Sequence, residues 1–101
     1  MDINKLMEQA QAMQRKMEQA QNEIKNTDYI GEASNGLVKV VIDGENNVKE
    51  VLINPDIVNK EDVEMLQDLI VIAMNDANQK LHTKQQETLG KVTGGIKIPG
   101  M

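Results

Sequence analysis

The sequence contains no cysteine, tryptophan or phenylalanine, and it has only one tyrosine. Without cysteine the chain has no disulfides, no thiolate metal sites and no cysteine nucleophiles. Proteins that stack the bases of single-stranded nucleic acid need several aromatic side chains, so Tyr29 alone nearly excludes that mode of binding. Binding to the backbone of duplex DNA stays open, because it requires only cationic and polar side chains.

No set of residues typical of an enzyme or a metal site is present. His82 is the only histidine, and Ser34, the only serine, precedes an Asn-Gly turn signal instead of lying in a nucleophile motif. Residues 43–47 resemble the start of a calcium-binding loop. Val48 stands at its sixth position and Asn54 at its twelfth, however, where such loops have glycine and glutamate. We therefore expect no enzymatic activity, no metal and no cofactor.

Segments that would direct the chain into a membrane are also missing. Residues 1–20 include Asp2 and Glu8 and lack the apolar core of a secretory signal. The longest aliphatic run, residues 69–74, is far too short to cross a bilayer. Together with the absence of cysteine, these features suit a cytoplasmic protein without a membrane partner.

Charge is distributed unevenly along the chain. Sixteen acidic and eleven basic residues give a formal net charge of −5. Residues 1–27 are neutral, residues 28–76 carry −8 and residues 77–101 carry +3. An ordinary solvated surface can produce such variation. If the protein binds a polyanion, its contacts should avoid the acidic middle segment.

The first 26 residues are predicted to form a long helix. Apolar residues alternate at spacings of three and four, and neither glycine nor proline interrupts them. This heptad series consists of Ile3, Leu6, Ala10, Met13, Met17, Ala20 and Ile24. Because alanine and methionine occupy much of the series, we expect a packing seam with another helix and not a free-standing coiled coil.

Residues 28–54 are predicted to form a three-stranded antiparallel meander. The expected strands are residues 29–34, 37–42 and 48–53. Asn35-Gly36 suits a type I′ hairpin turn, and residues 43–47 supply the second turn. The middle strand is apolar on both faces, so we expect something to cover each side.

A second long helix is predicted over residues 59–89, followed by a flexible tail at 90–101. Asn59 or a neighbour can cap the helix, and Gly90 is a natural end. The sequence therefore indicates one α+β domain spanning residues 1–101. Helices of about 36 Å and more than 40 Å exceed a compact globule of this size, whose radius of gyration is about 13 Å.

Such overhanging helices and surplus apolar surface favour a symmetric homodimer. The interface is expected to use apolar side chains of the middle strand and the second helix. These are Val38, Val40, Leu66, Leu69, Ile70, Ala73 and Met74.

The order of elements and several local strings make the chain similar to the YbaB/EbfC family of small bacterial nucleoid-associated DNA-binding proteins. The strings are QAQAMQ at 9–14, GLVKV at 36–40, INP at 53–55, MLQDLI at 65–70, AMNDA at 73–77, TGG at 93–95 and PGM at 99–101. The resemblance implies a cytoplasmic, nucleoid-associated, tweezer-like homodimer that binds double-stranded DNA with weak or limited sequence preference. Gln67 and Met74 depart from the glutamate and aromatic residue that the family often has at these positions.

DNA contact is expected on the first helix, the end of the second helix and the tail, where cations are not outnumbered. The candidates for phosphate contacts are Lys5, Arg15, Lys16, Lys25, Lys80, Lys84, Lys91 and Lys97. An alternative function is a protein-interaction adaptor whose acidic middle segment recruits a basic protein partner.

Overall fold

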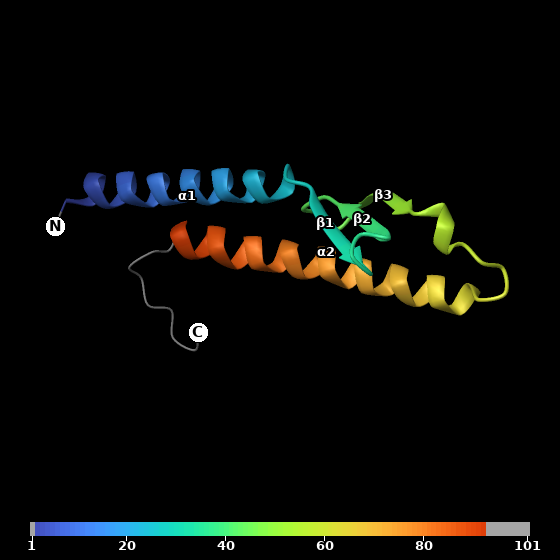
Figure 1. The fold of residues 1–101 in the computed structure, drawn as a ribbon. Coiled ribbons are helices and arrows are strands. Elements are labelled where there is room, and N and C mark those ends of the chain that lie inside the picture. Colours follow the sequence, from blue (N-terminus) through green and yellow to red (C-terminus); the bar gives the residue numbers. More distant parts are fainter. Residues whose placement is uncertain (1, 93–101) are drawn as a thin grey trace.

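The computed structural model describes residues 2–92 of the chain. Its elements are α1 (Ile3–Lys25), β1 (Tyr29–Ala33), β2 (Val38–Ile42), β3 (Val48–Ile53), the short 3₁₀ helix η1 (Pro55–Ile57) and α2 (Val63–Val92), as Figure 1 shows. Two long helices thus flank a three-stranded antiparallel sheet. The predicted α+β architecture is confirmed.

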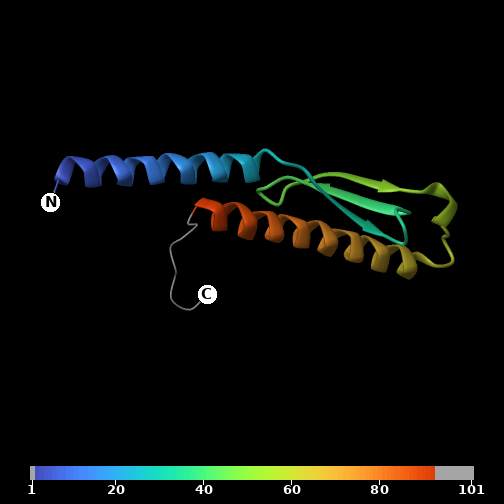
Figure 2. The ribbon, with the colours of Figure 1, turned by 60° about the vertical axis from the view of Figure 1, so that its left-hand side comes forward.

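α1 begins where the side chain of Asp2 accepts hydrogen bonds from the backbone N–H groups of Asn4 and Lys5. These bonds satisfy donors that the first helical turn leaves unpaired. Only the C-terminal part of the helix is buried, at Ala20 and Ile24. The heptad seam therefore packs on α2 only near its end, as Figure 2 also shows.

The sheet has the order β1-β2-β3 and the predicted meander connectivity. The first hairpin differs from the two-residue turn expected at Asn35-Gly36. Ala33 pairs with Val38, and the loop between them contains three consecutive residues with positive φ, beginning at Ser34. Consequently β1 ends at Ala33, one residue earlier than predicted, and β2 begins at Val38, one residue later. Glycine and asparagine tolerate positive φ. Ser34 adopts it as well, so the loop is longer than the two-residue turn.

α2 covers one face of the sheet and forms the core with it. Val38, Val40 and Ile42 of β2 point to that face and have no exposed surface. Gly31 of β1 lies so close to α2 that an added Cβ would sit 1.9 Å from the backbone oxygen of Ala73. A glycine in the strand facing alanines in the helix therefore lets the two backbones approach closely. No element of the described chain lies on the opposite face of the sheet in Figure 2. The prediction that both faces of the middle strand are covered therefore holds for one face within residues 2–92.

Both ends of the second helix differ from the prediction. It begins at Val63 and not at residue 59, because Asp62 Oδ1 accepts the Met65 N–H at 3.2 Å. Asn59 instead accepts the Glu61 N–H and shapes the preceding turn.

At its C-terminal end, the helix runs past Gly90 to Val92, so residues 90–92 are helical and not part of a tail. Thr88 is buried and Leu89 packs against the core. Such packing can outweigh the cost of about 1 kcal/mol that a glycine adds to a helix interior. Residues 93–101 of the predicted tail lie outside the described part of the chain.

The molecule is long and narrow, with extents of 73 × 26 × 16 Å and a Cα radius of gyration of 19.6 Å. This is well above the value of about 13 Å for a compact chain of 100 residues. Figure 1 shows α1 extending beyond the C-terminal end of α2. Across residues 2–92, neither helix has the length and apolar content needed to cross a membrane.

Candidate nucleic-acid interface

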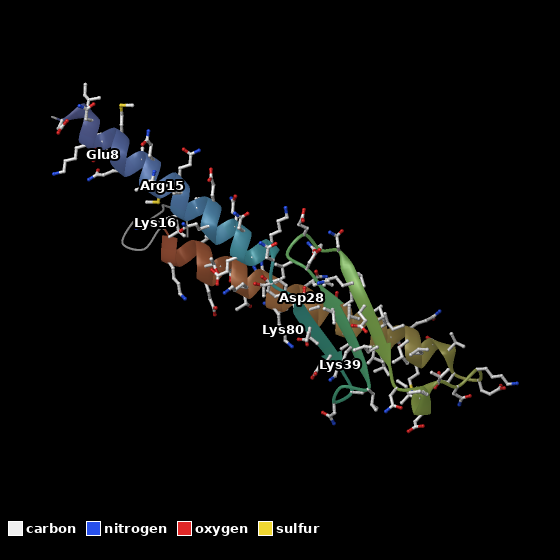
Figure 3. The ribbon with its side chains drawn as sticks, turned by 90° about the horizontal axis from the view of Figure 1, so that it is seen from above. Glu8, Arg15, Lys16, Asp28, Lys39 and Lys80 are labelled. Atoms are coloured by element: carbon white, nitrogen blue, oxygen red, sulfur yellow. The ribbon has the colours of Figure 1, made fainter. Side chains whose placement is uncertain are left out.

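Residues 3–16 of α1 form a projecting segment that we call the arm. All its side chains are exposed except the half-buried Ala12. The arm presents Lys5, Arg15 and Lys16, and Figure 3 shows Arg15 and Lys16 on α1, near the level at which α2 ends. Within residues 2–92, none of these three cations forms an ion pair. Their charges are therefore available to an external anion.

Lys25 and Lys84, two other predicted DNA contacts, are engaged inside the protomer. The Lys84 ammonium lies 2.9 Å from Glu23 Oε1, which links α2 to α1. This contact lowers the pKa of Glu23, through the hydrogen bond first and the charge of Lys84 second. Lys25 lies 3.7 Å from the carboxylate of Glu45 in the turn between β2 and β3. Both cations have acidic neighbours that compete with phosphate.

Lys80 lies far from the arm, beside the sheet (Figure 3). Its ammonium donates a 2.6 Å hydrogen bond to the backbone oxygen of Ile30 and lies 3.3 Å from Asp76. Lys91 is exposed in the last turn of α2 and has no ion pair among the described residues. Lys97 falls outside that part of the chain.

The opposite end of the molecule is acidic. Residues 55–68, which we call the acidic end, contain one lysine and five carboxylates: Asp56, Glu61, Asp62, Glu64 and Asp68. Figure 1 places this segment far from the N-terminus of α1. The fold therefore places the cations of the arm and the carboxylates of the acidic end at opposite ends of an elongated molecule.

The side chains predicted for the dimer interface fall into two groups. Val38, Val40 and Ala73 have no exposed surface and form the core of the protomer itself. The remaining four are half-buried and pack against that core: Leu66, Leu69, Ile70 and Met74. More exposed apolar side chains lie elsewhere, on β3 and on other faces of α2, including Val51, Leu52, Val71 and Ile72. The sequence pattern identified apolar positions, but it could not show which of them would be buried between the sheet and α2 within one protomer.

The turn that resembled a calcium loop uses its carboxylate on its own backbone. Asp43 Oδ1 accepts the N–H groups of Glu45 at 2.8 Å and Asn47 at 3.0 Å. The Asn47 N–H, followed by further hydrogen bonds, holds the pKa of Asp43 below its ordinary value. Residues 2–92 contain no cluster of three histidine or carboxylate side chains that could hold a metal ion.

Asp76 lies outside the arm, and the sequence analysis did not foresee its contacts with β1 and Lys80. Its Oδ2 atom accepts the backbone N–H of Glu32 at 2.9 Å. This bond, followed by the contact with Lys80, lowers the pKa of Asp76. Charge alone could not have separated Asp76 from the other acids of the middle segment. The available signal was the spacing of Asp76 and Lys80 by four residues, beside the small residues Ala73 and Ala77. Small residues indicate close packing of the helix, and the spacing places both charged side chains on one side of it.

Comparison with known proteins gives one consistent family. A sequence model of the YbaB/EbfC DNA-binding family matches residues 1–96. A nucleoid-associated protein of Clostridium novyi is 43% identical, with 100% of this chain and 89% of the relative aligned. Another, from Acetivibrio thermocellus, is 45% identical, with 99% and 89% aligned. The crystal structure of an uncharacterized Helicobacter pylori protein shares the fold, with a TM-score of 0.74, 21% identity, and coverage of 93% of this chain and 99% of that one.

Proposed function

Because this chain belongs to the YbaB/EbfC DNA-binding family, we propose that it binds duplex DNA in the bacterial nucleoid as a homodimer. The contacts are made mainly with the phosphate backbone, by the cations of the arm. Such contacts fix a protein on DNA without reading its sequence, so binding is broad, with weak or limited sequence preference.

The observation that carries this proposal is the state of the arm cations. Lys5, Arg15 and Lys16 have no ion-pair partner within residues 2–92, whereas Lys25, Lys80 and Lys84 have carboxylates within 4 Å. An unpaired cation can replace counterions on DNA without first losing an internal partner. Because the arm also lies far from the acidic end, it can approach a polyanion although the chain carries −5.

Apolar surface supports the homodimer. Val51 and Leu52 of β3 are each 44% exposed, and Val71 of α2 is 57% exposed. Within residues 2–92, β3 pairs only with β2, so one of its edges has no strand beside it there. Two copies related by a two-fold axis would pair these edges and cover the adjacent apolar side chains. The dimer would then carry two arms, one from each protomer.

A salt titration of DNA affinity tests the binding mode. For a random duplex, the logarithm of the association constant should fall with the logarithm of salt concentration by about 0.9 for each neutralised phosphate. The triple variant K5A/R15A/K16A should weaken binding and reduce this slope by up to about 2.7 for each engaged arm. Fluorescence anisotropy at several salt concentrations measures both quantities.

The matched control removes three cations from the body of the protein. K39A/K49A/K60A changes the net charge by the same amount, but these lysines lie outside the arm. Because Lys49 lies in β3, at the proposed seam, sedimentation velocity must first show that this variant is still a dimer. It should retain most of the salt slope. Equal losses in the two triple variants, with both confirmed as folded, would mean that overall charge and not the arm governs binding.

The homodimer is tested separately by sedimentation velocity. Wild-type protein should sediment as a dimer, and V51K should shift the equilibrium toward monomer, because it places a cation at the proposed seam. V58K, which adds the same charge at an exposed position of the acidic end, should leave the dimer intact. A monomeric wild-type protein at micromolar concentration would contradict the proposal.

A second candidate function is an adaptor for a basic protein, favoured by the acidic end. Exposed Val58 and Val63 lie among its carboxylates, so the surface offers both charge and apolar contact. The test is a nuclease-treated pull-down with E61Q/E64Q, which leaves the helix-capping Asp62 unchanged. Loss of a basic partner in this variant would support the adaptor, and recovery of nuclease-sensitive partners alone would argue against it.

A further inference from the structure

Side chains of α2 contact the edge of β1 that does not pair with β2. In the described part of the chain, β1 has a neighbouring strand, β2, on one side only, which leaves a row of backbone groups on the other. On that side, Asp76 accepts the Glu32 N–H at 2.9 Å and Lys80 donates to the Ile30 oxygen at 2.6 Å. Asp76 and Lys80 also contact each other at 3.3 Å. One acceptor and one donor thus stand where a neighbouring strand would supply a carbonyl and an N–H.

Close packing of β1 on α2 makes this arrangement possible. A Cβ on Gly31 would lie 1.9 Å from the Ala73 oxygen and 2.4 Å from the Ala77 nitrogen. With the strand this close to the helix backbone, even the short side chain of Asp76 reaches the strand edge. Lys80 follows one helical turn later and reaches the carbonyl two residues before Glu32.

We propose that Asp76 and Lys80 act as a substitute strand that closes the β1 edge against addition of a second copy of this chain. An unprotected strand edge is a template for pairing with another chain. The segment that this contact excludes is β3 of another copy. Among residues 2–92, no side chain donates to or accepts from the backbone of β3, so its outer edge is available for pairing.

The two edges differ in what their pairing would produce. Pairing of β3 with β3 is isologous and closes after two copies, whereas pairing of β3 with β1 is head-to-tail and can continue indefinitely. Closing the β1 edge therefore removes the open-ended mode and leaves the closed one. A β3–β3 dimer uses the outer edge of β3, so addition of β3 to β1 competes with that dimer and starts from copies whose β3 edge is still unpaired.

The test compares the self-association of D76A/K80A with that of wild-type protein. Sedimentation velocity over a hundredfold concentration range should give one boundary for wild type and a series of larger species for the variant. The matched control is K25A/E45A, which removes a cation and a carboxylate from an exposed pair whose side chains form no hydrogen bond to the backbone of β1 or β3 within residues 2–92. It should sediment like wild type. A folded D76A/K80A that also sediments like wild type would overturn the proposal.

A second pair of variants covers the case in which the double variant does not fold. D76N keeps an oxygen that can accept the Glu32 N–H, whereas D76L has similar size and no acceptor. D76L should form larger species and should expose the Glu32 amide to hydrogen exchange, while D76N should do neither. Identical behaviour of D76N and D76L would overturn the proposal. The size of wild-type protein alone decides the separate question of the homodimer.

Discussion

The ammonium of Lys84 and the carboxylate of Glu23 lie 2.9 Å apart and join α2 to the packed part of α1. Figures 1 and 2 show the C-terminal part of α1 running beside α2, and the pair connects these two helices. The hydrogen bond, followed by the charge of the partner, lowers the pKa of Glu23 and is the main cause that raises the pKa of Lys84. Its contribution to stability should therefore depend on pH.

When the difference in melting temperature between wild type and E23Q is plotted against pH, we expect a plateau between an acidic and an alkaline limit. Because the pKa of Glu23 is lower in the folded state, the stabilisation is complete above its ordinary value of 4.5 and is lost as pH falls through the folded value. Because the pKa of Lys84 is raised, the stabilisation persists below 10.5 and is lost as pH rises through the folded value. Thermal denaturation from pH 3 to 11 measures this difference, and E8Q, which removes an arm carboxylate that forms no ion pair within residues 2–92, serves as the control.

Glycine substitutions at two positions should have opposite effects on stability. G31A places a Cβ against the backbone of α2, so it should lower the free energy of unfolding by at least about 2 kcal/mol or prevent folding. G90A has nothing within 4 Å of the new Cβ and lies in a helix, so it should raise that free energy by about 0.5–1 kcal/mol. Urea denaturation measures both. Equal effects would mean that the close approach of β1 to α2 is absent.

Tyr29 offers a direct optical measurement, because it is the only aromatic residue. It is 5% exposed, and its hydroxyl donates to the Ile24 oxygen at 2.9 Å. Burial raises its pKa above the ordinary value of 10.0. Ultraviolet titration of the folded protein should therefore give a midpoint above 10, and the urea-unfolded protein should give the ordinary value. Y29F should cost about 1 kcal/mol of stability through the lost hydrogen bond.

Single variants should separate lysines that bind DNA from lysines that hold the fold. K16A should weaken DNA binding without changing the melting temperature, because Lys16 forms no ion pair within residues 2–92. K84A should lower the melting temperature, since it removes the partner of Glu23. Anisotropy and thermal denaturation of the same samples test both statements. A K84A variant that loses only DNA affinity would assign Lys84 to the interface.

Much of the fold could be predicted from local signals, and the errors have specific causes. The heptad series from Ile3 to Ile24 identified α1, and the β-branched run at 38–42 identified the middle strand. The end of α2 was missed because packing at Thr88 and Leu89 outweighs the local preference of Gly90. Its start was missed because the nearby Asn59 and Asp62 are both good caps, and only the path of the chain selects Asp62.

The candidate site was less predictable than the fold. Sequence reasoning identified the cations of α1 and α2 but could not tell which of them have partners. Lys16 and Lys84 are chemically equivalent, and of the two only Lys84 forms an ion pair with a carboxylate of the described residues. Likewise, Val38 and Val51 are both strand valines, yet α2 covers only the first.

The sequence by itself determined the α+β order of elements, the aliphatic core and the lack of aromatic platforms, because periodicity and composition act locally along the chain. The tertiary structure alone decided which charges are paired, which strand edge is closed by Asp76 and Lys80, and where the arm begins. These properties depend on distances between residues as far apart as Ile30 and Lys80, and such distances exist only once the helices and the sheet have packed together.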